Sequence, residues 1–184
     1  MIHVGLKLPW STRILDLKQY IRDISDFPQP GILFKDITPL VSHPGAFRHV
    51  IETFSSLYKA FDAEVVVGIE ARGFVIAAPL AFNLDSQFVL VRKEGKLPLE
   101  TTKMKYSLEY GESALEVHTD AINPGQRVLI VDDLIATGGT MAAAARLVET
   151  LGGEVAALMA VIEIVDLKGR DRLRGYQVFS QVQY

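Results

Sequence analysis

An apolar run that leads into two acids has the clearest chemistry in the sequence. The segment VLIVDDLIATGGT spans residues 128–140 and places Asp132 and Asp133 after residues expected to form a buried strand. In an open α/β sheet, ligands bind beside the carboxyl ends of the strands. The two carboxylates can accept hydrogen bonds from vicinal hydroxyls, so they are candidate ribose-binding residues.

The loop after these acids has the composition of a phosphate site. It consists of Ala136, Thr137, Gly138, Gly139 and Thr140 and leads into an alanine-rich helical segment. Glycines let backbone N–H groups converge, and the start of a helix adds the positive end of its dipole. The threonine hydroxyls can donate further hydrogen bonds. A ribose that carries a 5-phosphate would satisfy both the acids and the loop.

This element has simpler interpretations. Two acids after a strand can be solvated loop residues or helix caps, and a Walker B strand also ends in acids. The order of strand, acids, ATGGT and helix disfavours a plain loop. The chain contains neither GxxxxGKS/T nor GxGxxG, so a nucleoside triphosphatase or a dinucleotide-binding protein would lack its main motif.

A second run, GIEARGF at residues 68–74, combines a glycine turn with a guanidinium. Arg72 can hold a phosphate through two hydrogen bonds, and Gly73 permits a close turn beside it. The simpler alternative is a surface arginine paired with Glu70. The run therefore predicts a second anion site at the end of another strand.

Basic residues flank a long polar segment at residues 93–111, which has little apolar periodicity and is expected to be a loop. A loop of this length in a compact domain is usually functional or disordered. Taken by themselves, basic residues such as Arg92, Lys93 and Lys96 are usually a solvated face. The later lysines are interpreted as a solvated face.

The elements that must position these residues alternate between strands and helices. Short runs rich in Val and Ile predict buried strands at residues 64–69, 88–92, 127–131 and 154–165, and a further strand is expected at 114–120. Helical spacing is found at residues 12–24, from Pro44 onward, at 73–82 and at 139–152. This alternation predicts an α/β fold with a mainly parallel twisted sheet flanked by helices.

Length and composition limit the class of protein. The 184 residues fit one domain over residues 1–184. The net charge of −3 argues against a nucleic-acid surface, and the absence of cysteine excludes thiolate zinc sites and cysteine nucleophiles. The four histidines have no metal-ligand spacing. Glu70 and Arg72 interrupt the most apolar window, and no signal peptide is found, so we expect no membrane span and a cytoplasmic protein.

These motifs resemble those of the type I phosphoribosyltransferases, whose signature for phosphoribosyl pyrophosphate (PRPP) is similar to VLIVDDLIATGGT. Three more segments resemble the adenine phosphoribosyltransferases in particular: DFPQPGILFKDITPL at 26–40, GIEARGF at 68–74 and SLEYG at 107–111. The resemblance covers roughly residues 13–184. It implies a small N-terminal hood over the base site, at about 13–40, and a flexible lid loop at about 93–110.

The resemblance also implies roles in binding adenine. The backbones of Leu33 and Lys35 would meet the adenine edge, Phe34 would stack on one ring face, and Leu134 would cover the other. Phe34 could instead be a core aromatic residue, which is the commoner fate of phenylalanine. Its position after a Pro-Gly break in a polar context favours the binding role.

For pyrophosphate, the resemblance implies the loop of Glu70, Ala71, Arg72 and Gly73, with a cis peptide bond between its first two residues. It also assigns Arg92, Lys93 and Lys96 to the charged rim of that site. Glu109 would be the catalytic carboxylate and Tyr110 a neighbouring lid residue.

The expected reaction joins adenine to the ribose of PRPP, which yields AMP and pyrophosphate. Mg²⁺ would arrive with PRPP and would not be held in a protein cage. No nucleic acid or membrane partner is expected, and the family is typically homodimeric. The alternatives are a phosphoribosyltransferase for another purine base, or a PRPP-binding regulator without catalysis.

Overall fold

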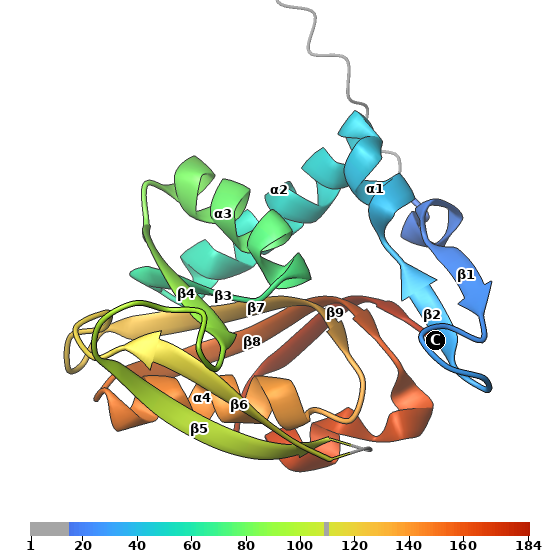
Figure 1. Ribbon diagram of the computed structural model, residues 1–184. Coiled ribbons are helices and arrows are strands. Elements are labelled where there is room, and N and C mark those ends of the chain that lie inside the picture. Colours follow the sequence, from blue (N-terminus) through green and yellow to red (C-terminus); the bar gives the residue numbers. More distant parts are fainter. Residues whose placement is uncertain (1–14, 109–110) are drawn as a thin grey trace, which may run out of the picture. The chain divides into compact units, whose positions relative to one another are not determined.

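The protein forms two compact units, which are described separately. The computed structural model describes residues 15–108 and 111–184 (Figure 1). The first unit spans Met1–Ala46 and the second Phe47–Tyr184. The expectation of one domain over the whole chain stays a prediction.

A short antiparallel ribbon forms the centre of the first unit. A 3-10 helix, η1 (Leu17–Tyr20), precedes strand β1 (Arg22–Ser25), which pairs with β2 (Leu33–Asp36), and helix α1 (Thr38–Ser42) follows. The helix expected over residues 12–24 is therefore wrong within the described residues. Cross-strand pairing overrides the helical spacing here: Arg22 lies opposite Asp36 and donates to its carboxylate at 2.6 and 3.1 Å.

The second unit contains a seven-stranded sheet in the order β5-β6-β4-β3-β7-β8-β9. Strands β4, β3, β7, β8 and β9 are parallel, whereas β5 and β6 form an antiparallel hairpin beside β4. The strands are β3 (Val65–Ile69), β4 (Gln87–Lys93), β5 (Thr101–Leu108), β6 (Gly111–His118), β7 (Arg127–Ile135), β8 (Glu154–Glu163) and β9 (Val178–Gln183). The prediction of a mainly parallel α/β sheet is confirmed.

Helices cover both faces of this sheet. Helix α3 (Arg72–Leu84) packs on β3 and β7 from one side and α4 (Gly139–Thr150) from the other, while α2 (Pro44–Ala60) enters the unit ahead of β3 (Figure 1). Because both faces are covered, every residue of β3 is buried, as are the last eight residues of β8. Two 3-10 turns, η2 (Val165–Leu167) and η3 (Gly169–Leu173), follow β8. No described helix is long and apolar enough to cross a membrane.

The segment expected to be a loop at 93–110 contains strand β5. Met104 and Tyr106 are partly buried against the core, while Lys103 and Lys105 point to solvent. This two-residue alternation is the signal of a half-buried strand, and the many lysines obscured it. Strand β9 was also missed, because half of the residues in VFSQVQ are polar and only Val182 in it is buried.

Candidate active site

The two acids lie inside strand β7, which continues past them to Ile135. The expectation that the strand ends at the acids is wrong, since Leu134 and Ile135 still pair with β8. Asp133 is buried, and Asp132 is partly exposed and accepts a hydrogen bond from the Asp133 backbone N–H at 2.8 Å. The acids nevertheless lie close to the carboxyl end of a central parallel strand, where ligands of such sheets bind.

Arg72 joins the second motif to these acids. Its Nε lies 2.9 Å from Asp133 Oδ2. The alternative pairing of Arg72 with Glu70 is not adopted. Gly73 permits the approach, because a Cβ there would lie 2.9 Å from both Asp132 Oδ1 and the Val131 carbonyl oxygen. A side chain at this position would separate the two motifs.

The environment of the acids shifts their pKa values. Burial raises the pKa of Asp132, and the neighbouring Asp133 carboxylate raises it further. Burial also raises the pKa of Asp133, although the Arg72 guanidinium works in the opposite direction. Two adjacent carboxylates with perturbed pKa values are typical of functional sites.

The loop at residues 70–73 begins with the expected cis peptide bond, between Glu70 and Ala71. The Glu70 carboxylate accepts hydrogen bonds from Arg92 at 2.9 and 3.2 Å and from the Lys93 backbone N–H at 3.1 Å. The hydrogen bonds from Arg92 hold the pKa of Glu70 below its ordinary value. Glu70 therefore connects the arginine loop to the basic residues at the end of β4.

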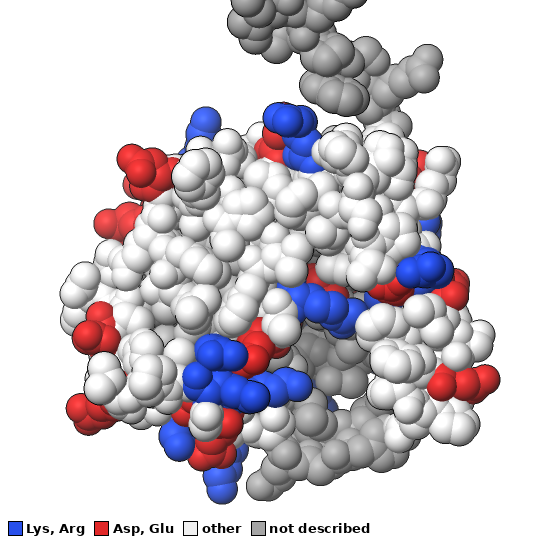
Figure 2. Space-filling model, turned by 45° about the horizontal axis from the view of Figure 1, so that its top comes forward, with Lys and Arg blue, Asp and Glu red and all other residues white. Residues whose placement is uncertain are grey.

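These basic residues are only partly neutralised. Arg92 is paired with Glu70, whereas Lys93 and Lys96 are exposed at the end of β4 and in the turn after it. On the face shown in Figure 2, Lys and Arg side chains lie beside Asp and Glu side chains on a mostly uncharged surface. The two lysines can therefore add positive charge at the carboxyl end of β4.

The glycine-rich loop has the backbone of an anion site. Gly138 has a positive φ of 78° and precedes the first turn of α4, which starts at Gly139. The helix N-terminus and the loop N–H groups can receive an anion there. One contributor was not predicted from the sequence: Gly169 of η3 packs its backbone directly against Gly138 and Ala136. No local sequence signal marks that contact.

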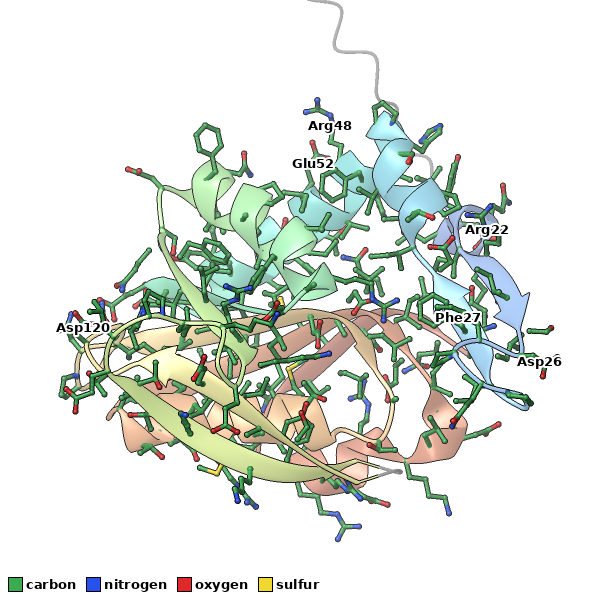
Figure 3. All side chains as sticks on the ribbon, in the orientation of Figure 1. Arg22, Asp26, Phe27, Arg48, Glu52 and Asp120 are labelled. Carbon is green, nitrogen blue, oxygen red and sulfur yellow. The ribbon has the colours of Figure 1, made fainter. Side chains whose placement is uncertain are left out.

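The proposed base-binding residues lie on β2 in the first unit. Leu33 is 51% exposed, and Phe34 packs edge-on against Phe27, which is labelled in Figure 3, with ring centroids 5.1 Å apart. The Lys35 Nζ lies 2.6 Å from Asp23 Oδ1, and the residue is buried. Phe34 is thus a partly buried aromatic residue that packs on Phe27, and Leu33 offers an open edge.

The second unit brings predicted site residues together at two places. Arg72 contacts Asp133, and Glu70 contacts Arg92 and the Lys93 backbone N–H. Leu134 is partly buried in β7 next to the acids. Glu109 and Tyr110 lie outside the described residues. Together these groups suit a phosphorylated sugar. The carboxylates can accept hydrogen bonds from hydroxyls, the glycine loop can bind one phosphate, and the guanidinium can bind others.

Comparison with known proteins agrees with this chemistry. A sequence profile of the phosphoribosyl transferase domain matches residues 36–182. The adenine phosphoribosyltransferase of Halothermothrix orenii is 53% identical over 92% of this chain and 99% of its own length. That of Carboxydothermus hydrogenoformans is 54% identical over 92% of this chain and 100% of its own length.

Solved structures give the same result. The adenine phosphoribosyltransferase of Thermoanaerobacter pseudethanolicus has a TM-score of 0.89 and 48% identity, covering 91% of this chain and 98% of the other. The Saccharomyces cerevisiae enzyme, crystallised with adenine and an imino-altritol bisphosphate, has a TM-score of 0.85 and 43% identity, covering 90% and 96%.

Proposed function

Since this chain belongs to the phosphoribosyltransferase family, and within it to the adenine phosphoribosyltransferases, we propose how its residues divide the work of the reaction. The chain converts adenine and PRPP to AMP and pyrophosphate, a step of purine salvage. The observation that carries the assignment of residues is the contact of Arg72 with Asp133, since it joins a phosphate-binding side chain to a hydroxyl-binding one.

The sugar of PRPP is held by the β7 acids and the loop after them. Asp132 and Asp133 accept hydrogen bonds from the two ribose hydroxyls. The 5-phosphate lies at the loop of residues 136–140, where Thr137 and Thr140 add hydroxyl donors to the backbone N–H groups. The positive φ of Gly138 at the start of α4 supports this proposal.

The pyrophosphate group is held by the loop of residues 70–73. Arg72 is the principal cation, and Arg92, Lys93 and Lys96 add charge at the rim. The support is geometric: Glu70 binds Arg92 through two hydrogen bonds, and its contact with the Lys93 N–H keeps this rim beside the loop. As the bond to the sugar breaks, these cations stabilise the negative charge that develops on pyrophosphate.

Adenine is read by the backbones of Leu33 and Lys35 and is held by Phe34 and Leu134. The edge of adenine has an amino donor beside a ring-nitrogen acceptor. A backbone carbonyl can accept from the amino group, and a backbone N–H can donate to the ring nitrogen. The exposure of Leu33 supports this role, as does the engagement of the Lys35 side chain with Asp23. Hypoxanthine would reverse both partners, which leaves acceptor facing acceptor and donor facing donor.

In the transfer step, the bond from the anomeric carbon to pyrophosphate breaks, and its electron pair leaves with pyrophosphate. A ring nitrogen of adenine then bonds to the carbon and gives up its proton, which Glu109 accepts or orients. Tyr110 and the rest of the lid keep water from the cationic sugar. A Glu109→Ala enzyme that turns over at the wild-type rate would contradict this role.

Mg²⁺ supplies charge neutralisation while it is bound to the oxygens of PRPP. Among the described residues, no group of three or more acids or histidines could hold a metal ion. The donor set fits a cation that brings most of its oxygen ligands with the substrate. Asp132 and Asp133 are the nearest carboxylates to the proposed sugar site.

The chain is proposed to act as a homodimer in the cytoplasm. Phe82 is 91% exposed and Val75 41% exposed, and their spacing of seven residues places both on one side of α3. An exposed apolar stripe of this kind is typical of an interface between subunits. The lack of cysteine is compatible with a reducing compartment. A monomer mass in sedimentation equilibrium at working concentration would contradict the dimer.

A panel of purine bases tests the function. The enzyme is assayed with PRPP and Mg²⁺ against adenine, hypoxanthine, guanine and xanthine. We expect kcat/KM for adenine to exceed that for the others by about 10⁴-fold, the discrimination that a polar site achieves. Preference for another base would identify a different transferase. PRPP binding without turnover of any base would identify a regulator.

A further inference from the structure

A buried carboxylate in β6, Glu116, has no place in the proposed mechanism. Its side chain is only 2% exposed, although it lies on a hairpin at the edge of the sheet. A buried ionised group is costly unless hydrogen bonds compensate it. The partners of Glu116 therefore indicate what the charge does.

Most of those partners are backbone N–H groups of the turn after β4. Glu116 Oε1 accepts the N–H groups of Lys96 at 2.7 Å and Leu97 at 2.8 Å. The Thr101 hydroxyl donates to Oε2 at 3.3 Å, and the Lys103 Nζ lies 4.0 Å away. One carboxylate thus holds consecutive N–H groups in one orientation, as an anion does in a backbone nest.

The ionised form of Glu116 makes these bonds. Burial raises the pKa of Glu116, but the backbone N–H groups of Leu97, Lys96 and Gly95 lower it, and the net pKa lies below its ordinary value. The carboxylate is therefore charged at neutral pH, and charge-assisted hydrogen bonds are the stronger kind.

This turn leads directly to the basic rim of the proposed pyrophosphate site. The Arg92 Nη1 donates to the Lys96 carbonyl at 2.9 Å, and the remaining Arg92 donors bind Glu70. Glu116 thereby fixes Lys96, the Lys96 carbonyl fixes Arg92, and Arg92 fixes Glu70. Arg92 and Glu116 also lie opposite each other in the β4–β6 pairing.

We propose that Glu116 is a positioning residue that holds the 94–97 turn, so that Arg92 and Lys96 meet the pyrophosphate group of PRPP. The inference rests on the proposed assignment of those basic residues to pyrophosphate. In this proposal Glu116 does not contact the substrate. Glu116 acts through the turn, and it affects the binding of PRPP and not that of adenine.

Glu116→Gln tests the proposal, because glutamine keeps the shape but replaces one acceptor oxygen by an N–H donor that faces other donors. We expect the KM for PRPP to rise about tenfold, the effect of losing roughly one charged hydrogen bond, while the KM for adenine stays within about twofold. Amide hydrogen exchange at Lys96 and Leu97 should become faster.

Two further variants keep the result interpretable. Val117→Ala removes a buried methyl pair from the same strand and should lower Tm without changing the KM for PRPP. Gly95→Ala strains the backbone of the turn, since Gly95 has a φ of 80° that alanine rarely adopts. The added Cβ would lie in open space and would contact no other residue. This variant should raise the KM for PRPP as Glu116→Gln does, with the core untouched.

Lys96→Ala separates this inference from the assignment beneath it. If Lys96→Ala leaves the KM for PRPP unchanged, the assignment of the basic rim to pyrophosphate fails. If Lys96→Ala raises that KM but Glu116→Gln and Gly95→Ala do not, the positioning role is overturned. Equal rises in both KM values for Glu116→Gln would also overturn it, since they would indicate a general structural defect.

Discussion

At the residue scale, Lys35 separates what a side chain does from what its backbone does. Its Nζ is engaged by Asp23 at 2.6 Å, and the residue is 6% exposed. The side chain therefore contributes to the β1–β2 ribbon of the first unit. We therefore propose that the backbone groups read the base, and no substitution of the side chain removes those groups.

We predict that Lys35→Ala keeps a strong preference for adenine over hypoxanthine, even where overall activity falls. Phe34→Ala should instead weaken adenine binding by about 1–3 kcal/mol through lost stacking. Measuring kcat/KM for both bases decides between backbone and side-chain reading. Asp23→Ala is the matched control, since it removes the same ion pair and leaves Lys35 in place. Efficient use of hypoxanthine by Lys35→Ala would show that the side chain reads the base.

At the element scale, the 3-10 turn η3 packs against the loop that we propose to bind the 5-phosphate. Gly169 packs against Gly138 and Ala136, and a Cβ on it would also lie 2.8 Å from Ile135 Cγ2. The atoms of the loop that this Cβ would meet belong to the backbone, so they cannot move aside as the end of a flexible side chain would. The first turn of α4 and the loop before it are therefore held by an element that follows the next strand.

We predict that Gly169→Ala displaces the loop and raises the KM for PRPP by about tenfold or more, the effect of weakening roughly one or two phosphate contacts. Gly153→Ala is the control: its Cβ would meet Ile122 Cγ2 at 2.8 Å and Val148 Cγ1 at 2.9 Å, at the amino end of β8. Steady-state kinetics and thermal melts on both variants separate loop displacement from lost stability. A shared fall in Tm with unchanged KM in both would refute the loop-support role.

At the scale of the whole molecule, buried carboxylates make the free energy of unfolding depend on pH. Glu163 is 4% exposed at its side chain and accepts hydrogen bonds from Arg170 at 2.7 and 2.8 Å and from Ser180 at 2.6 Å. These bonds join the end of β8 to η3 and β9. The hydrogen bonds from Arg170 lower the pKa of Glu163 to about 2.

The depressed pKa of Glu163 determines whether stability rises or falls with pH. The stabilisation is fully present above the ordinary value of 4.5 and is lost as pH falls toward about 2, because the folded state must then take up a proton that it disfavours. We predict that the free energy of unfolding drops by up to about 3 kcal/mol over that window through this group. Glu163→Gln should be less stable at pH 7 and should lose that part of the pH dependence. A wild-type slope in the variant, measured by denaturant unfolding at several pH values, would contradict the assignment.

Local patterns in the sequence were sufficient for the sheet and for the motifs. Runs of Val and Ile predicted β3, β4, β7 and β8, since strands covered on both faces need continuous apolar residues. Helical spacing predicted α2, α3 and α4. The acids, the glycine loop and the arginine loop were recognisable because each is a contiguous segment whose chemistry depends on neighbours in the chain.

Only the tertiary structure decided which distant residues meet. Arg72 pairs with Asp133 and not with nearby Glu70, because parallel β3 and β7 bring their carboxyl ends together. Gly169 packs against the loop after β7, and Glu116 holds the turn after β4, through contacts that no spacing in the sequence encodes. Local spacing failed for β1, where cross-strand partners outweigh helical preference, whereas in β5 the alternation of a half-buried strand was present but obscured by lysines. Propensity and periodicity act between near neighbours, whereas a folded site depends on contacts that the chain makes only once its strands are paired.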